Sequence, residues 1–295
     1  MRTYLTAVAI TICLAACNKQ SPVKPPTEGV GSTPDTTVTV TPPPPPPPTE
    51  IIETEPALLV AVTKKISSDI GGYYIGLPTH YKDSGSTKKY PLFIFIHGAG
   101  QYGNGGTDLI KVLDQATPKL VKQKLFPPSF TVGDKHYSFI VLAPQFAQYP
   151  NNLDEVITLI NYAKANYPVD PSMIYISGLS IGSEIAGYVA ANHPTVFAAM
   201  VPIAGITASQ GGCENMVDAK LPIWAFHNND DQQVYTSTTK DFITMYNSMN
   251  PAIPARLTLF SPAGNLGHDA WTRATDPSYK EDGKNIYEWM LQYTR

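Results

Sequence analysis

The hydrophobic positions of this chain fall into short continuous runs, separated by longer segments of mixed polarity. A run that is apolar throughout is typical of a strand buried on both faces of a parallel sheet. Such runs occupy residues 90–96, 139–143, 173–176, 198–203, 223–226 and 257–260. The segments of helical length between and after these runs are 108–125, 153–166, 181–192, 238–249 and 285–293. This alternation predicts an α/β domain with a mostly parallel central sheet and helices on both faces.

Two segments before these runs, 57–66 and 72–77, have the pattern of opening strands. Two connections in the assignment, 204–222 and 261–284, exceed ordinary loop lengths, and either is long enough to shape a pocket.

The pattern changes before residue 56. Residues 18–55 contain no aromatic side chain and include seven consecutive prolines at 42–48. Such a segment cannot bury enough apolar surface to fold, so we interpret residues 17–55 as a disordered tether. The alternative for this segment is a proline-rich ligand of another protein. The folded domain is therefore predicted to span residues 56–295.

Residues 1–16 have the pattern of a lipoprotein signal peptide. Arg2 supplies a positive start, residues 4–14 form a mostly apolar run, and the segment 14–17 resembles a bacterial lipobox that ends in Cys17. Acyl chains on Cys17 would anchor the protein to a membrane. We therefore expect a protein of the bacterial cell envelope that faces the periplasm or the exterior. An ordinary secretory signal, in which Cys17 is incidental, is the alternative.

Composition excludes some functions. The chain is 43% hydrophobic and 15% charged, its net charge is -3, and it has no basic patch interleaved with aromatic residues. Nucleic acid is therefore not an expected partner. Of the three cysteines, Cys13 lies in the signal segment and Cys17 in the lipobox, which leaves Cys213 without an intramolecular disulfide partner.

Candidate chemistry begins after the apolar run 173–176. Residues 178–182 have the pattern Gly-X-Ser-X-Gly, with Ser180 at the centre and a helix-like segment behind it. A strand that turns sharply into a helix in this way holds the serine hydroxyl clear of the backbone. Ser180 is therefore the candidate nucleophile.

The apolar run 90–96 is followed by a glycine-rich turn at residues 97–103. Amides in such a turn can bind the oxyanion of a tetrahedral intermediate. We assign this role to Ala99 or Gly100, together with Ile181, which follows the candidate nucleophile. A phosphate-binding loop is the competing interpretation, but the turn lacks the Lys-Ser/Thr ending of such loops.

A serine hydroxyl needs an imidazole to accept its proton and a carboxylate to orient that imidazole. Asp231 and His268 follow the last two apolar runs, and working groups gather at strand ends in parallel sheets. The chain order Ser180, Asp231, His268 is the order found in one class of serine hydrolase, with a doubly covered parallel sheet. Asp230 is the second choice for the acid.

Together these residues resemble the α/β-hydrolase superfamily. The resemblance rests on residues 97–100, 178–182, 224–234 and 268–271 and covers the domain from about residue 58. Within the superfamily, the chain is similar to secreted esterases of the feruloyl/acetyl-xylan esterase, polyhydroxybutyrate-depolymerase-like and dienelactone-hydrolase-like groups. Asn228 and Ser183 depart from these groups, which usually carry glycine there.

The resemblance implies an α/β-hydrolase fold and a two-step hydrolysis of carboxylic esters. Ser180 would attack the ester with His268 as general base and Asp231 orienting His268, and water would then release the acyl group. No metal or organic cofactor is expected, since the sequence lacks a ligand cluster with metal-binding spacing. The expected partner is a small-molecule or polysaccharide ester.

The substrate pocket is less well defined by the sequence. Gln101, Tyr102, Gln145 and Trp271 lie at strand exits and are expected to line it, with packing in the core or loops as the equal alternative for each. The predicted location favours esters of carbohydrate or aromatic acids. Two other classes of function remain open. A serine peptidase of the prolyl-oligopeptidase type uses the same triad but normally carries a further domain, and a non-catalytic surface binding domain is the other.

Overall fold

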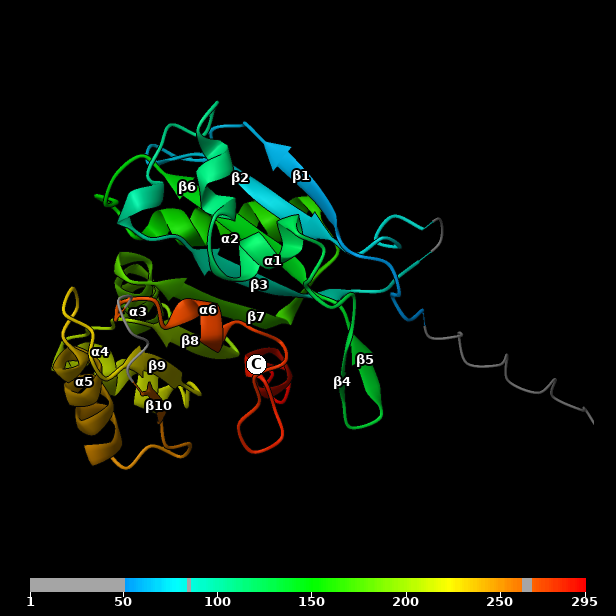
Figure 1. Cartoon of the computed structure of the whole chain (residues 1–295). Coiled ribbons are helices and arrows are strands. Elements are labelled where there is room, and N and C mark those ends of the chain that lie inside the picture. The colour runs from blue at the N-terminus through cyan, green and yellow to red at the C-terminus, as the bar shows by residue number, and fades with distance from the viewer. Residues whose placement is uncertain (1–50, 84–85, 262–266) are drawn as a thin grey trace, which may run out of the picture. The chain divides into compact units, whose positions relative to one another are not determined.

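The computed structural model describes residues 51–83, 86–261 and 267–295 (Figure 1). These residues belong to a compact unit that runs from Thr49 to Arg295. The predicted signal peptide, Cys17 and the proline run of the predicted tether lie outside the described residues. Within the described part of the chain, no helix is long and apolar enough to cross a membrane.

An eight-stranded sheet forms the centre of this unit, with the strand order β1-β2-β6-β3-β7-β8-β9-β10. The strands are β1 (Leu58–Val62), β2 (Ile70–Leu77), β3 (Tyr90–Ile96), β6 (Ile140–Phe146), β7 (Val169–Leu179), β8 (Ala199–Ile203), β9 (Trp224–Asn228) and β10 (Arg256–Phe260). The pairs β1-β2 and β2-β6 are antiparallel, and the remaining pairs are parallel. The predicted mostly parallel sheet is therefore confirmed.

Helices cover both faces of the sheet. One hydrophobic cluster takes its helical residues from α2 (Asp154–Asn166), α3 (Ile181–Asn192), α4 (Gln210–Asp218) and α5 (Thr236–Ser248). The other takes them from α1 (Ala116–Lys122), α6 (Trp271–Ala274) and α7 (Ile286–Met290). The arrangement is the three-layer architecture that the alternating pattern predicted.

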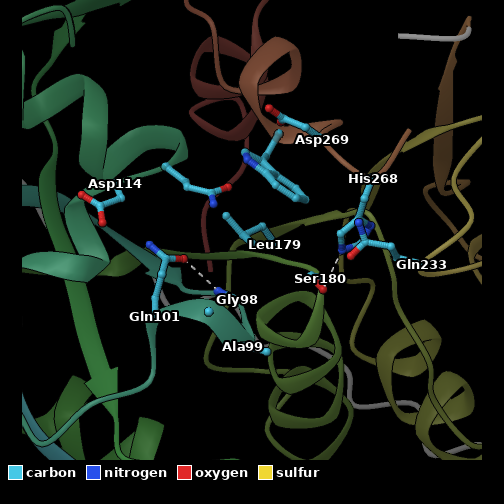
Figure 2. A pocket seen from close by; sticks show the side chains of 12 residues that line it. Gly98, Ala99, Gln101, Asp114, Leu179, Ser180, Gln233, His268 and Asp269 are labelled. Carbon is cyan, nitrogen blue, oxygen red and sulfur yellow. Dashed lines mark hydrogen bonds between the residues drawn. The ribbon is translucent and has the colours of Figure 1, made fainter. Parts of the chain in front are cut away.

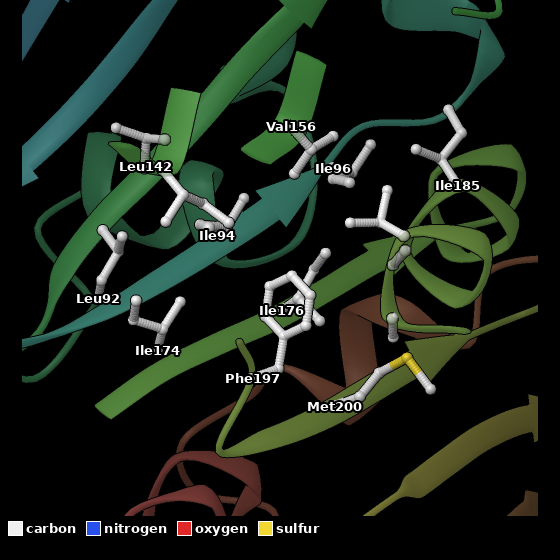
Figure 3. Packing of buried hydrophobic residues seen from close by; sticks show 14 of the residues in the cluster. Leu92, Ile94, Ile96, Leu142, Val156, Ile174, Ile176, Ile185, Phe197 and Met200 are labelled. Atoms are coloured by element: carbon white, nitrogen blue, oxygen red, sulfur yellow. The ribbon is translucent and has the colours of Figure 1, made fainter. Parts of the chain in front are cut away.

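The central strand β3 shows why its sequence is apolar throughout. Leu92, Ile94 and Ile96 point into the first cluster, where they pack beside β7 and α3 (Figure 3). Phe93 and Phe95 point into the second cluster on the opposite face. Because successive side chains of a strand alternate between faces, burial on both faces requires a continuous apolar run.

The structure corrects one predicted helix. Residues 108–125 form the 3-10 helix η2 (Leu109–Leu113) and the separate helix α1. Between them Gln115 is extended, with φ -142° and ψ 159°, and Ala116, the first residue of α1, has a positive φ of 54°. Neither conformation belongs to an α-helix, so the chain changes direction there.

Two helices and a two-stranded hairpin fall within segments that the sequence pattern left unassigned. The long connection 204–222 contains α4, and the connection 261–284 contains α6. The hairpin of β4 (Phe130–Val132) and β5 (Lys135–Tyr137) projects from the rest of the unit in Figure 1. Its strands have three residues each, which is too short for a periodic pattern to be recognised.

The folded domain begins earlier than residue 56, where the sequence placed its start. The Glu53 side chain is 1% exposed and accepts hydrogen bonds from Thr79 Oγ1 at 2.6 Å and from the Thr79 amide at 3.0 Å. It also contacts His80 Nδ1 at 2.8 Å and accepts a bond from the Tyr90 hydroxyl at 3.2 Å. Glu53 was assigned to the tether because a lone carboxylate gives no pattern of burial.

Candidate active site

Ser180 occupies the sharp turn between β7, which ends at Leu179, and α3, which begins at Ile181. Its φ of 54° and ψ of -125° are strained for a residue with a side chain. The turn is so tight that a Cβ on Gly178 would lie 2.3 Å from the Gly182 carbonyl oxygen. Glycine at this position therefore permits the turn that presents the Ser180 hydroxyl.

The structure brings Ser180, His268 and Asp231 together in one hydrogen-bonded chain. His268 Nε2 lies 2.9 Å from Ser180 Oγ, and His268 Nδ1 lies 2.7 Å from Asp231 Oδ2. The carboxylate can only accept, so Nδ1 carries the proton and Nε2 is left to accept from the serine hydroxyl. This is the tautomer that a general base needs.

Asp231 is held by more than His268. Its Oδ1 accepts from the amides of Gln233 at 2.9 Å and Val234 at 3.0 Å. Burial alone would raise the pKa of this carboxyl, but the hydrogen bond from His268 and the two amides outweigh burial and lower the pKa. Asp231 therefore stays ionised and fixed in orientation.

A second histidine, His227, supports the same carboxylate from the other side. Its Nε2 lies 3.0 Å from Asp231 Oδ2 and 3.0 Å from the Val234 carbonyl oxygen, which can only accept. Nε2 is thus the donor, and Nδ1 accepts from the Thr239 hydroxyl at 2.8 Å. Burial lowers the pKa of His227 and keeps it neutral. The sequence does not single out His227 as a candidate site residue; its spacing of four residues from Asp231 was the available signal.

The three predicted oxyanion residues all lie at helix starts beside Ser180. Ala99 and Gly100 are the first two residues of the 3-10 helix η1 (Ala99–Gln101), and Ile181 is the first residue of α3. Amides in the first turn of a helix have no partner within that helix. Ala99 and Ser180 line the same two cavities. The arrangement thus provides amide donors next to the serine hydroxyl.

Two cavities meet at Ser180. The first, here called the His268 cavity, has a volume of about 410 Å³. Figure 2 shows Gln101 and Asp114 on one side of it, His268 and Gln233 on the other, and Ser180 between them. Its remaining lining residues are Gly98, Ala99, Gly100, Gln115, Leu179, Asp269 and Trp271. Polar and apolar residues therefore both line this cavity.

The second cavity, here called the Glu184 cavity, has a volume of about 450 Å³. Its lining is mainly apolar and aromatic, with one carboxylate. The lining residues are Ala99, Tyr102, Tyr149, Ser180, Ile181, Glu184, Gly205, Ile206, Thr207, Val234 and Thr238. Tyr149 follows the end of β6, so the rule that working groups gather at strand exits could have found it. Glu184 lies one helical turn after Ser180, a spacing that places both on one face of α3.

The structure places the four predicted pocket residues in different surroundings. Trp271 lines the His268 cavity, with its ring 5.1 Å from the His268 ring centre, and Tyr102 lines the Glu184 cavity. Gln101 lines the His268 cavity, but its side chain is committed to the Gly98 amide and the Lys111 carbonyl. Gln145 lines neither cavity and instead packs against loops, which was the equal alternative.

Gln145 is fully buried and serves the loops behind the site. Its Oε1 accepts from the Gly105 amide at 2.9 Å, and its Nε2 donates to the carbonyls of Gln101 at 3.0 Å and Asp108 at 2.9 Å. These bonds use the polar atoms of the side chain, so Gln145 holds the 101–108 loop rather than a substrate.

Both positions that depart from the related esterases are buried. Ser183 is fully buried and Asn228 is 1% exposed, and among the described residues Ser183 Oγ and Asn228 Nδ2 have no hydrogen-bond partner. Neither side chain interrupts the chain of bonds from Ser180 to Asp231. In the ranges that the structure describes, no group of three or more His, Cys, Asp and Glu could hold a metal ion.

This site and fold define the protein as an α/β-hydrolase. The model of the phospholipase/carboxylesterase family matches residues 83–273, about two thirds of the chain. The chain belongs to this family. The resemblance predicted from the sequence motifs is thereby confirmed.

Similar proteins extend this picture at the level of the fold. A thermostable esterase is 24% identical, with a TM-score of 0.55 over 82% of this chain and 64% of that chain. An S-formylglutathione hydrolase from Staphylococcus aureus is 13% identical, with a TM-score of 0.57 over 82% of this chain and all of that chain. A ferulic acid esterase is 17% identical, with a TM-score of 0.51 over 75% of this chain and 95% of that chain.

One curated relative is similar over a short segment. Poly(3-hydroxyalkanoate) depolymerase C of Paucimonas lemoignei is 45% identical over 47 residues. The match spans 16% of this chain and 11% of the depolymerase. The chain thus covers a small part of that enzyme and less than two thirds of the thermostable esterase.

Proposed function

We propose that this protein hydrolyses carboxylic esters through an acyl-enzyme on Ser180, with His268 as the general base and Asp231 as the acid that orients it. The observation that carries the proposal is the chain of hydrogen bonds at 2.9 Å from Ser180 Oγ to His268 Nε2 and at 2.7 Å from His268 Nδ1 to Asp231 Oδ2. The strained backbone of Ser180, which exposes its hydroxyl at the meeting point of two cavities, supports the same assignment.

In the first step, Ser180 Oγ forms a bond to the ester carbonyl carbon while its proton passes to His268 Nε2. The carbonyl oxygen becomes an oxyanion, which the amides of Ile181 and of Ala99 or Gly100 stabilise. When the tetrahedral intermediate collapses, the bond to the alcohol oxygen breaks and that oxygen takes the proton from Nε2. Asp231 stabilises the imidazolium that exists in between.

In the second step, water replaces the alcohol. Its proton passes to His268 Nε2 as its oxygen attacks the acyl carbon, and collapse of the second intermediate returns that proton to Ser180 Oγ. The acid leaves, and the enzyme is restored without any other reactant.

Replacement of Ser180 by alanine tests this function. With p-nitrophenyl acetate, methyl ferulate and acetylated xylan as substrates, Ser180→Ala is expected to lower kcat by about 10⁴-fold or more. Circular dichroism would show that the variant is folded. Ester hydrolysis that survives the substitution at wild-type rate contradicts the proposal, and cleavage of peptides but not esters favours a peptidase.

We further infer that the enzyme acts outside the cytoplasm on esters of carbohydrate or aromatic acids, tethered to a membrane through a lipid on Cys17. The support is the lipobox-like segment 14–17 and the proline run that separates it from the catalytic domain. A tethered enzyme would meet substrates outside the cell. Cys17→Ser is expected to move the protein from the membrane fraction to the soluble fraction. An unchanged membrane fraction contradicts the lipid anchor.

A further inference from the structure

The two cavities at Ser180 differ in their relation to the general base. The His268 cavity contains the imidazole, with Gln233 and Trp271 beside it, whereas the imidazole is not among the residues that line the Glu184 cavity. Ser180 and Ala99 line both cavities. An ester bound at Ser180 therefore has two directions in which its halves can extend.

If the proposed function holds, the path of the proton determines which cavity takes the alcohol of the ester and which takes its acyl group. The leaving alcohol oxygen must take its proton from His268 Nε2, so it lies within hydrogen-bond reach of that atom. The alcohol therefore extends into the His268 cavity. The acyl substituent of the tetrahedral carbon points away from the imidazole, and the Glu184 cavity is the one of the two that the imidazole does not line.

The walls of the Glu184 cavity combine apolar surface with a single carboxylate. Tyr102, Tyr149, Ile206 and Val234 provide the apolar and aromatic surface. Among the described residues that line this cavity, the half-buried Glu184 is the one that carries a charge. Such a wall favours an apolar or aromatic acyl group whose far end meets the carboxylate.

Tyr102, Tyr149 and Glu184 line the same cavity, so the charge of Glu184 bears on both phenols. Burial first, and then the charge of Glu184, raises the pKa of Tyr149 to about 12. Burial and the same charge raise the pKa of Tyr102. Lys111 Nζ donates to the backbone carbonyl of Tyr102 and lies 3.6 Å from Asp108 Oδ2. Lys111 is thus already paired with another carboxylate.

We propose that the Glu184 cavity is the acyl subsite and that Glu184 sets its selectivity. Glu184 accepts a hydrogen bond from acyl groups that end in a hydroxyl and repels acyl groups that end in a carboxylate. A hydrogen bond to a charged acceptor in a partly desolvated site is stronger than one between neutral groups. A second carboxylate in the same cavity has no cation to offset the repulsion.

The test uses three methyl esters that share one alcohol and differ only at the far end of the acyl group. They are the methyl esters of 3-phenylpropanoate and of its para-hydroxyl and para-carboxylate derivatives. In the wild-type protein, kcat/KM is expected to be about tenfold higher for the hydroxyl ester than for the unsubstituted ester and about tenfold lower for the carboxylate ester. In Glu184→Gln, both ratios are expected to move toward one.

Glu214→Gln is the matched control, because this exposed carboxylate lies on α4, outside the residues that line either cavity. Its ratios are expected to equal those of the wild type. Ratios that are the same in Glu184→Gln and wild type overturn the acyl subsite, and so do ratios that Glu214→Gln shifts equally.

Hydrolysis of p-nitrophenyl acetate, whose acyl group ends in a methyl without a hydroxyl or a carboxylate, separates the two proposals. If the wild type hydrolyses p-nitrophenyl acetate but shows no acyl preference, the subsite is wrong and the esterase function stands. If Ser180→Ala hydrolyses p-nitrophenyl acetate as fast as wild type, the proposed function fails, and the subsite fails with it.

Discussion

At the scale of single residues, the four hydrogen bonds of Asp231 decide how the base is held. Two amides fix its Oδ1, while His268 and His227 both donate to its Oδ2. Burial raises the pKa of this carboxyl, but the hydrogen bonds from His268 and the two amides outweigh burial and lower it. The neighbouring Asp230 has an Oδ1 without a partner among the described residues. The two carboxyl groups therefore have very different surroundings, although the two residues are adjacent in the sequence.

This difference predicts unequal effects of two matched substitutions. Asp231→Asn places an amide next to His268 Nδ1 and favours the wrong tautomer, so kcat is expected to fall by about 10⁴-fold. Asp230→Asn is expected to stay within about threefold of the wild type, since no bond to His268 is lost. Steady-state kinetics with p-nitrophenyl acetate measures both. If Asp230→Asn lowers kcat more than Asp231→Asn does, the assignment of Asp231 as the acid is wrong.

At the scale of elements, the turn from β7 into α3 depends on close contact with β3. A Cβ on Gly182 would lie 2.3 Å from the Ile96 carbonyl oxygen and 2.4 Å from that of His97. Both atoms belong to backbone that leads into the oxyanion loop, so neither can move without displacing that loop. The contact of Gly182 with the Ile96 and His97 carbonyls thus fixes the position of the Ser180 turn relative to the proposed oxyanion donors.

Gly182→Ala is therefore expected to lower the free energy of unfolding by about 2 kcal/mol or more, because the added methyl overlaps backbone. It is also expected to lower kcat, because the turn and the loop move apart. Urea unfolding and ester hydrolysis measure the two effects. Gly211→Ala on α4 is the control: a Cβ there meets nothing within 4 Å, so the stability is expected to be unchanged or slightly higher. Wild-type stability of Gly182→Ala contradicts this account of the turn.

Comparison of pattern and structure at this scale shows what a sequence can predict. The buried strand at 90–96 and the helix at 181–192 have the predicted bounds, because their residues alternate between two clusters or repeat at helical spacing. The break at Gln115 and Ala116 leaves no such pattern. The candidate triad follows from motif spacing at strand exits, whereas the cavity walls come from loops whose paths depend on tertiary contacts.

At the scale of the whole folded unit, charged side chains hold the first and last few residues of the described domain. Near the start, the buried Glu53 binds Thr79, His80 and Tyr90. At the end, the Arg295 guanidinium donates to the carbonyls of Phe197, Pro194 and Ala219. These bonds join Glu53 and Arg295 to strands of the sheet and to the segments that connect them.

The bond between Glu53 and His80 predicts a dependence of stability on pH. Burial opposes ionisation of Glu53, but the bonds from Thr79 and His80 lower its pKa below 4.5, so its contribution is present above pH 4.5 and is lost as pH falls through the lowered value. The bond to Glu53 raises the pKa of His80 above 6.5, so its contribution is complete below pH 6.5 and is lost as pH rises through the raised value. The pair therefore contributes most between pH 4.5 and pH 6.5.

Glu53→Gln removes this contribution and is expected to lower the free energy of unfolding by about 1–3 kcal/mol near pH 6. The difference from wild type is expected to be smaller at pH 3 and at pH 9. Urea unfolding at the three pH values measures it. A difference that is constant across this range shows that Glu53 acts by packing alone.

Covalent labelling tests most directly whether Ser180 is the nucleophile of ester hydrolysis. A fluorophosphonate forms a phosphorus–oxygen bond only with an activated serine and releases fluoride. Peptide mapping by mass spectrometry is expected to find the label on Ser180, and ester hydrolysis is expected to fall in proportion to the labelled fraction. Full inhibition with the label on another residue, or hydrolysis that persists when Ser180 is fully labelled, contradicts the account.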